Sequence, residues 1–291
     1  MNKVYNKAPL PFQGQKRNQV KNMREILKEF PDDALYLDVF GGSGLLSQLI
    51  KQEKPKARVI YNDFDNYTER LLHIDDTNEL LAKIYEILRL YPRSRKISND
   101  DKYKILNIIK NFDGYKDYLT LSSHLLFSGG YVLNYNELAK KPFFKPKSTI
   151  HPVYNAEDYL KGVKIVKKDG FELLKEYENK DCVLVLDPPY LQTKTEGYNQ
   201  SFKLKDFLNL VCFIKEPYIL FGSHKSDIMP FFEFANKKSN LSLTKNYKIK
   251  QSSLSTTTKG NKNMIDYVIY KANNEWVSLY GAFKNYIGSK P

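Results

Sequence analysis

An apolar run that stops at a cluster of glycines restricts the fold of this chain more than any other feature. Residues 35–40 (LYLDVF) precede Gly41-Gly42-Ser43-Gly44, and residues 45–50 then carry leucine and isoleucine at helical spacing. Residues 58–62 read as a second short strand that follows a proline. The predicted order is strand, tight glycine turn, helix and strand, which is the start of a βαβ unit.

Further strands are predicted in the second half of the chain. Residues 163–166 and 218–222 read as strands, and residues 247–270 are expected to contain a terminal hairpin. The run 182–186 (CVLVL) is wholly apolar, which is typical of a central parallel strand that is buried on both faces. Together these elements predict an α/β fold with a doubly wound, mostly parallel, Rossmann-like sheet and helices on both faces.

The middle of the chain interrupts this pattern. From residue 75 to about 110, apolar residues recur at helical spacing with a break at Tyr91-Pro92-Arg93, so two helices are expected. The stretch 111–160 is rich in Tyr, Phe, Asn and Lys and has no clear period. We therefore expect a core domain formed by residues 1–74 and 161–272, a mainly helical inserted domain over 75–160, and a C-terminal tail over 273–291.

The composition indicates what kind of molecule this protein binds and which kinds of site it lacks. The 291 residues include 46 Lys and Arg against 33 Asp and Glu, a formal charge of +13, so a nucleic acid or an acidic membrane surface is a candidate partner. Only Cys182 and Cys212 are present, which gives neither a disulfide framework nor a metal-ligand cluster. No run approaches the ~20 apolar residues of a membrane span, and residues 1–16 have no apolar signal region. We expect a cytoplasmic monomer without a metal site and without membrane association.

The glycine turn is the first candidate binding element. It lies with Asp38 at the carboxyl edge of the predicted sheet, where glycine lets the backbone approach a ligand closely. Asp63 follows Gly41 by 22 residues, at the end of the next strand, where a carboxylate can accept the hydroxyl protons of a ribose. The alternatives are a plain structural turn for the glycines and a helix-capping role for Asp63, with Asp65 as the competing ribose acceptor. These two features fit a nicotinamide cofactor and S-adenosylmethionine equally well.

Asp187-Pro188-Pro189-Tyr190 follows the buried strand directly and so also lies at the carboxyl edge. An aromatic amine such as adenine N6 is a poor nucleophile, because its lone pair is delocalised into the ring. The Asp187 carboxylate and the Pro188 carbonyl, held rigid by the prolines, can accept hydrogen bonds from both N–H groups and direct the lone pair toward a methyl donor. Tyr190 can stack on the base, which must leave a duplex at a cost of about a few kcal/mol. An ordinary proline turn is the alternative.

These motifs resemble the Dam-like, D12-class family of adenine-N6 DNA methyltransferases, over roughly residues 1–74 and 161–272. The chain has the order of that family: a cofactor segment, the glycine motif, a target-recognition insertion and the catalytic tetrapeptide. The segment Pro11 to Arg17 is similar to the family's N-terminal motif, with Gln15 in place of its second glycine. Asp169 matches an acidic position near the cofactor adenine, and Phe40 matches the residue beside the cofactor's methionine portion.

The resemblance implies S-adenosylmethionine as cofactor, double-stranded DNA as partner, no metal, and two sets of site residues. The catalytic set is Asp187, Pro188, Pro189 and Tyr190. The cofactor-binding set is Phe12, Lys16, Asp38, Phe40, Gly41, Gly42, Ser43, Gly44, Asp63 and Asp169. For Lys16, a solvated surface position is the alternative.

The inserted domain carries the residues expected to hold DNA. Arg93, Arg95, Lys96, Lys140, Lys141, Lys145 and Lys147 are interleaved with Tyr135, Phe143 and Phe144. Phosphate contacts and wedging aromatics suit a target-recognition region, and a helical lid with a solvated basic face is the alternative. The recognition sequence depends on positions in space that no motif encodes.

Several substrates are compatible with the same tetrapeptide. Methylation at cytosine carbon 5 is disfavoured, because neither cysteine lies in the Pro-Cys loop that such enzymes need. Cytosine N4 and RNA adenine are the alternatives among enzymes, and a non-catalytic DNA-binding protein with the same fold is the alternative from another class. Ser in place of Asp is commoner in tetrapeptides for cytosine N4, so Asp187 favours adenine. A restriction partner, if one exists, is a separate protein, because the chain has no nuclease motif.

Overall fold

The computed structural model describes residues 4–127, 130–145, 153–189, 202–223, 226, 228–238, 245–254 and 264–272. The strands are β1 Leu35–Asp38, β2 Arg58–Asn62, β3 Lys164–Val166, β4 Val183–Leu186, β5 Tyr218–Ser223, β6 Lys248–Leu254 and β7 Met264–Lys271. The helices are the 3-10 turn η1 Arg17–Gln19, α1 Val20–Leu27, α2 Leu45–Glu53, α3 Tyr67–Leu72, α4 Ile74–Leu88, α5 Asn99–Asn111, α6 Tyr118–Leu125, α7 Tyr135–Lys140, α8 Gly170–Glu176, α9 Leu204–Phe213 and α10 Ile228–Lys238.

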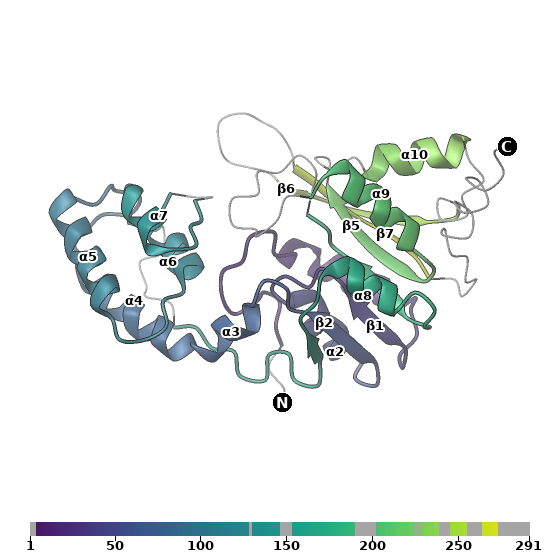
Figure 1. Cartoon of the computed structure of the whole chain (residues 1–291), viewed down its shortest axis with the longest axis horizontal. Coiled ribbons are helices and arrows are strands. Elements are labelled where there is room, and N and C mark those ends of the chain that lie inside the picture. The colour runs from purple at the N-terminus through teal and green to yellow at the C-terminus, as the bar shows by residue number, and fades with distance from the viewer. Residues whose placement is uncertain are drawn as a thin grey trace.

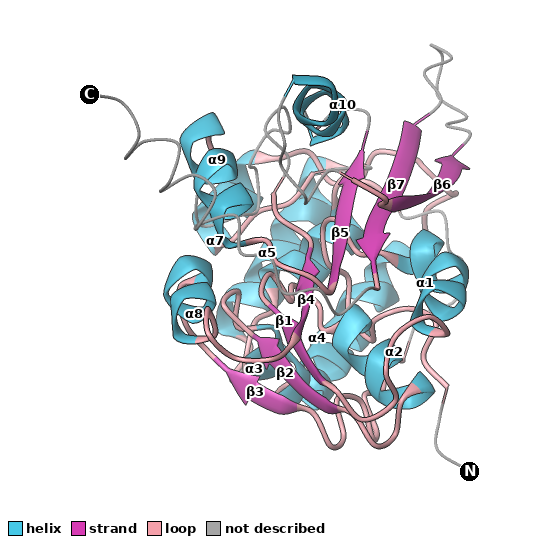
Figure 2. Cartoon of the chain, turned by 90° about the vertical axis from the view of Figure 1, so that its right-hand side faces the viewer, coloured by secondary structure: helices cyan, strands magenta, loops and turns pink. Residues whose placement is uncertain are grey.

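The strands form one seven-stranded sheet in the order β3-β2-β1-β4-β5-β7-β6. From β3 to β5 every pairing is parallel, whereas β7 runs antiparallel to both β5 and β6. The predicted doubly wound, mostly parallel sheet is therefore confirmed, and so is the terminal hairpin. Figure 2 shows the strands stacked side by side, with α1 and α2 on one face and α8 and α9 on the other.

Side chains that alternate between the two faces of the strands divide the hydrophobic core into two halves, one on each face of the sheet. In β4, Val183 and Val185 pack with α1, α2 and α3, while Leu184 and Leu186 pack with α8, α9 and α10. Because successive side chains of a strand point to opposite faces, a run that is apolar at every position suits a strand covered on both sides. This is the reason why the run 182–186 could be assigned from sequence.

The two ends of the described chain meet on one face of the sheet. Val268 and Tyr270 of β7 share a hydrophobic cluster with α1. Gln19 Nε2 donates to Ser252 Oγ of β6 at 2.7 Å, and the Tyr270 hydroxyl donates to Glu29 Oε1 at 3.0 Å. The N-terminal helix and the last hairpin therefore stabilise each other directly.

The middle of the chain builds a separate hydrophobic cluster from α4, α5, α6 and α7. Figure 1 places these helices beside the sheet rather than on its faces. The two helices expected before residue 111 are confirmed as α4 and α5, and the break between them contains Tyr91-Pro92-Arg93. The stretch 111–160, which lacked a clear period, also contains α6 and α7, and it contributes Leu125, Val132 and Leu138 to this cluster.

No helix among the described residues is long and apolar enough to cross a membrane.

Candidate active site at the carboxyl edge of the sheet

The glycine turn after β1 is shaped by close contacts that only glycine allows. A Cβ atom on Gly41 would lie 2.2 Å from Tyr61 Cδ2 and 2.9 Å from the Asn62 carbonyl oxygen. Gly42 has a φ of +50°, and a Cβ there would lie 2.9 Å from Phe12 Cε1. The turn is therefore pressed between β2 and the N-terminal segment, with the Phe12 ring against it.

Asp38 ends β1 beneath this turn and is completely buried. Its Oδ2 accepts a hydrogen bond from Ser47 Oγ at 2.7 Å, and its Oδ1 is a buried atom without a hydrogen-bond partner in the described structure. Burial raises the pKa of Asp38 to about 7, and the charge of Asp187 adds to this effect. The site thus contains a buried carboxyl group that takes up a proton near neutral pH.

Asp187 follows β4 directly and lies beside Lys16. Its Oδ2 is 2.6 Å from Lys16 Nζ, and the two side chains are 16% and 11% exposed. Burial raises the pKa of Asp187, the Lys16 ammonium lowers it, and the Asp266 carboxylate raises it. Within the described residues, Asp187 Oδ1 has no hydrogen-bond partner. One carboxylate oxygen is held by the lysine, and the other is available to a ligand.

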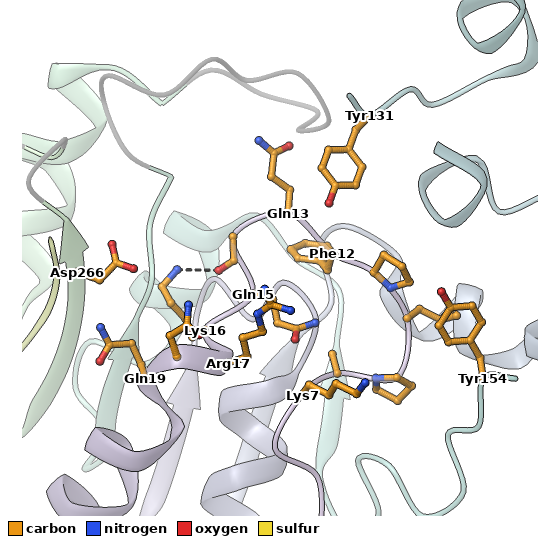
Figure 3. Close-up of a pocket in the computed structure, with 16 residues that line it drawn as sticks. Lys7, Phe12, Gln13, Gln15, Lys16, Arg17, Gln19, Tyr131, Tyr154 and Asp266 are labelled. Atoms are coloured by element: carbon orange, nitrogen blue, oxygen red, sulfur yellow. Dashed lines mark hydrogen bonds between the residues drawn. The ribbon is translucent and has the colours of Figure 1, made fainter. Parts of the chain in front are cut away.

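A cavity of about 530 Å³ opens beside Lys16, and of the expected site residues Phe12 and Lys16 line it. It is lined by residues 7–19 together with Tyr131, Tyr154 and Asp266. Figure 3 shows Lys16 on the side of the cavity where Asp266 lies, with Phe12 in the middle and Tyr131 and Tyr154 on the opposite side. Residues 7–19 therefore form one wall of the cavity, between the carboxyl edge of the sheet and the helical region.

The structure gives Asp63 the capping role that the sequence left open. Its oxygens accept hydrogen bonds from the backbone N–H groups of Tyr67 and Thr68, at 2.6 and 3.0 Å, and from the Thr68 hydroxyl. The Tyr61 hydroxyl lies 2.9 Å from the same carboxylate. Asp65 has no hydrogen bond or ion pair to any described residue, and burial, followed by the charge of Asp63, raises its pKa. Asp65 is thus the carboxylate with free acceptor capacity.

Asp169 and Phe40 lie together on the other side of the glycine turn. Asp169 caps α8 through Oδ1, which accepts from the backbone N–H groups of Phe171 and Glu172 at 2.9 and 3.3 Å. A Cβ on Gly170 would lie 3.1 Å from Phe40 Cε1, and the Phe40 ring contacts Phe202 edge to face. The Oδ2 atom of Asp169 has no hydrogen-bond partner among the described residues.

The structure brings most of the expected site residues to one edge of the sheet, from Phe12 and Lys16 to Asp38, the glycine turn and Asp187. Tyr190, which is expected to stack on the base, lies outside the described residues. No group of three or more His, Cys, Asp or Glu side chains in the described part of the chain could hold a metal ion.

Sequence reasoning missed Asp266, Tyr131 and Tyr154, which line the cavity from outside the N-terminal segment. Asp266 reaches the site because the antiparallel β7 pairs it with Ser223, at the carboxyl end of β5. A single carboxylate within an apolar strand was its signal in the sequence. Tyr131 and Tyr154 come from the aperiodic middle stretch, where no pattern marks one tyrosine over another.

The family to which this chain is similar agrees with the position of these residues. A family model for D12 class N6 adenine-specific DNA methyltransferases matches residues 12–216. The chain belongs to this family. The match to the D12 class begins at Phe12 and ends before β5, so it includes the glycine turn, the helical region and Asp187. The resemblance inferred from the motifs is thereby confirmed.

A Haemophilus influenzae (strain Rd) protein described as a "putative methyltransferase" is 43% identical over 257 residues, which cover 84% of this chain and 86% of that protein. The crystal structure of precorrin-6y C5,15-methyltransferase from Geobacter metallireducens GS-15 covers 88% of both chains at 10% identity. Its TM-score of 0.32 is too low to add to the argument. Membership of the D12 class makes the chain a methyltransferase.

Proposed function

We propose that this D12 methyltransferase is a site-specific DNA enzyme that transfers a methyl group from S-adenosylmethionine to adenine N6. The observation that carries the proposal is the position of Asp187. Its carboxylate lies at the carboxyl end of β4, with one oxygen held by Lys16 and the other unoccupied by any described residue. An acceptor of this kind is what an exocyclic amine needs for activation.

The described residues fit the proposed cofactor. Gly41 and Gly42 let the turn pack closely against Tyr61 and Phe12, and the Phe12 ring supplies an aromatic face to the cavity. Asp65 and Oδ2 of Asp169 are carboxylate acceptors without partners among the described residues, as ribose hydroxyls and an adenine amino group require. When bound, S-adenosylmethionine supplies an activated methyl group on a sulfonium centre. We propose that Asp65, in place of Asp63, binds the ribose, and that Asp169 contacts the cofactor adenine.

The assignment of Asp65 as the ribose acceptor predicts opposite effects for substitutions of Asp65 and Asp63. Asp65→Asn is expected to weaken cofactor binding by about tenfold or more, because a hydrogen bond to a charged group contributes about 1.5–3 kcal/mol. Asp63→Ala is expected to lower the free energy of unfolding by about 1–2 kcal/mol through loss of the α3 cap, with a smaller effect on affinity. Isothermal titration calorimetry and urea unfolding measure the two effects. The reverse pattern would restore Asp63 as the ribose acceptor.

In the transfer step, the chain's own groups orient and polarise the amine. Asp187 and the Pro188 carbonyl accept hydrogen bonds from the two N6–H groups, which raises electron density on nitrogen. Transfer of the methyl group to N6 would leave S-adenosylhomocysteine as the second product, and the methylated nitrogen would then release one proton to solvent. Neither a metal ion nor a covalent enzyme intermediate is part of the proposed step.

The basic residues of the helical region form a candidate surface for DNA. Backbone hydrogen bonds pair residues 94–97 with 143–145, and they place exposed Arg95 and Lys96 beside Phe144. Phe127 is 62% exposed and contacts the Phe144 ring edge to face at 5.7 Å. Phosphate contacts and a wedging aromatic pair can be provided here, so we propose that residues 75–160 recognise the target.

Two residues of the helical region that were expected from sequence to contact DNA are buried instead. Lys145 is only 5% exposed, and its Nζ donates to the Leu88 carbonyl at 2.7 Å and lies over the Tyr85 ring. Phe143 is buried in the core of the helical region. Both residues stabilise this region, so they are poor candidates for contact with DNA.

The target base has to leave the duplex to reach Asp187. Unstacking costs about a few kcal/mol, and aromatic stacking in the pocket offsets part of it. We propose that Tyr190 stacks on the flipped adenine and that Pro189 stiffens the loop.

A methylation assay tests the proposal directly. The protein is expressed in a host that lacks adenine methylation, and the genome is sequenced by a method that detects N6-methyladenine. Complete methylation of one short motif is expected from the wild type, and none from Asp187→Ala. Methyl groups on cytosine N4 or on RNA would change the substrate, and soluble wild-type protein that binds both cofactor and DNA without transfer would leave only a DNA-binding role.

A further inference from the structure

Lys16 has a neighbour that its expected role as a cofactor ligand does not explain. Its Nζ lies 2.6 Å from Asp187 Oδ2 and donates to the Gly14 carbonyl oxygen at 2.9 Å. Gly14 has a φ of +76°, which glycine adopts readily, so the turn that presents this carbonyl suits the residue. The ammonium group is therefore fixed from two sides, with the side chain only 11% exposed.

Apart from Lys16, the charged groups that face Asp187 among the described residues are carboxyl groups. Asp38 faces it from β1 and Asp266 from β7, and both are acidic. Lys16 is the cation that faces Asp187 among the described residues. Like charges and burial both disfavour an ionised carboxylate, and an adjacent cation opposes them.

Asp38 shows what happens at this edge to a carboxyl group that no cation contacts, since the Lys16 charge lowers its pKa less than any of the other causes change it. It is fully buried, accepts from Ser47, and has its pKa raised to about 7. Asp187 is held in similar surroundings with a lysine against one oxygen. The two carboxyl groups therefore differ in whether a cation touches them and in exposure, since Asp38 is fully buried and the Asp187 side chain is 16% exposed.

We propose, on the basis of the function proposed above, that Lys16 is a positioning residue for methyl transfer: it keeps the Asp187 carboxylate ionised and holds Oδ2, so that Oδ1 is left to accept the substrate N–H. A protonated carboxyl group has a donor where the carboxylate has an acceptor, and its remaining oxygens accept hydrogen bonds less strongly. The Lys16–Asp187 pair therefore sets the pH range over which Asp187 is ionised and its Oδ1 can accept the substrate N–H.

The pH dependence of kcat/KM tests this inference. In Lys16→Met the pKa of Asp187 is expected to rise, so activity is lost at low pH and recovers as the pH rises through the new value. We expect the acid limb to move upward by about one pH unit or more, which is a loss of about tenfold or more on that limb. Lys16→Arg, which retains the charge, is expected to restore most of the wild-type profile.

A matched control is available at the opposite edge of the sheet. Lys248 Nζ also lies 2.6 Å from a carboxylate, Oε2 of Glu29, but its side chain is 63% exposed. Lys248→Met removes a lysine from an ion pair of equal length, and the pH profile is expected to stay that of the wild type. An acid limb unchanged in Lys16→Met would overturn the inference. So would a loss of cofactor affinity that is the same at every pH, since Lys16 would then be a cofactor contact.

A measurement without turnover separates this inference from the proposed function. In Lys16→Met the folded-state pKa of Asp187 lies further above its unfolded value, so this group favours the folded state at low pH and loses that contribution as pH rises. Urea unfolding should show a stability deficit, relative to wild type, that grows between pH 5 and pH 8. A deficit of equal size at both pH values would refute the inference even if the protein methylates DNA, and a wild type without transferase activity would refute only the proposed function.

Discussion

Asp187→Ala is expected to lower kcat for adenine methylation by at least about a hundredfold to a thousandfold, the usual effect of losing one group that stabilises developing charge. The substitution removes an acceptor that is 16% exposed and lies at the end of β4. Cofactor affinity should change little, because the glycine turn, Asp65 and Asp169 are untouched. Single-turnover kinetics and equilibrium cofactor binding measure the two effects separately.

Two further variants sharpen this test. Asp187→Asn keeps one acceptor oxygen without the charge, so its activity is expected to fall between those of wild type and Asp187→Ala. Asp181→Ala removes an exposed carboxylate near the opposite end of β4 and should leave kcat unchanged. Loss of cofactor binding in Asp187→Ala, with normal kcat at saturation, would contradict the assigned role.

Arg70→Met is expected to lower the free energy of unfolding by about 3–5 kcal/mol, because it leaves a buried carboxylate without its partner. The Arg70 and Asp117 side chains are 5% and 2% exposed, and Nη2 lies 3.0 Å from Asp117 Oδ2. Nη2 also donates to the Pro11 carbonyl at 2.8 Å and to Thr120 Oγ1 at 3.2 Å. Arg70 thus joins α3, the start of α6 and the segment that carries Phe12, so cofactor affinity is expected to fall as well.

Arg24→Met is the control for Arg70→Met. Arg24 Nε lies 2.9 Å from Glu53 Oε1, but both side chains are 32% exposed, and such pairs contribute about 0–1 kcal/mol. Urea unfolding at pH 7 compares the two. Adding Asp117→Asn to Arg70→Met should recover part of the loss, since the buried charge disappears while the amide oxygen can still cap α6. Equal losses in Arg24→Met and Arg70→Met would show that burial of the ion pair has no special effect.

The strands could be predicted because their signal is local. A run such as 182–186 is apolar at every position only if both faces are covered, and glycines follow β1 where the backbone is pressed against Tyr61. The helices α6 and α7 could not be predicted in the same way. They are short, and they become stable by packing against α4 and α5 rather than through their own periodicity.

The sequence predicted where in the fold the residues of the candidate site lie, but not which of these residues contact one another. The sequence placed Asp187 and the glycine turn at one edge, because parallel strands end there together. It could not decide between Asp63 and Asp65, since both follow β2 and only the geometry of α3 shows which one is occupied as a cap. Nor could it pair Lys16 with Asp187, which lie 171 residues apart in the chain.

The contact between α1 and the β6–β7 hairpin has a consequence for synthesis on the ribosome. Residues that complete the packing of α1 belong to β6 and β7, so α1 cannot finish packing until synthesis has passed Lys271. The helices between Ile74 and Lys140 contact mainly one another and can be completed long before. A nascent chain of this protein is thus expected to hold a formed helical region and an exposed, unfinished sheet, which is when chaperones would engage it.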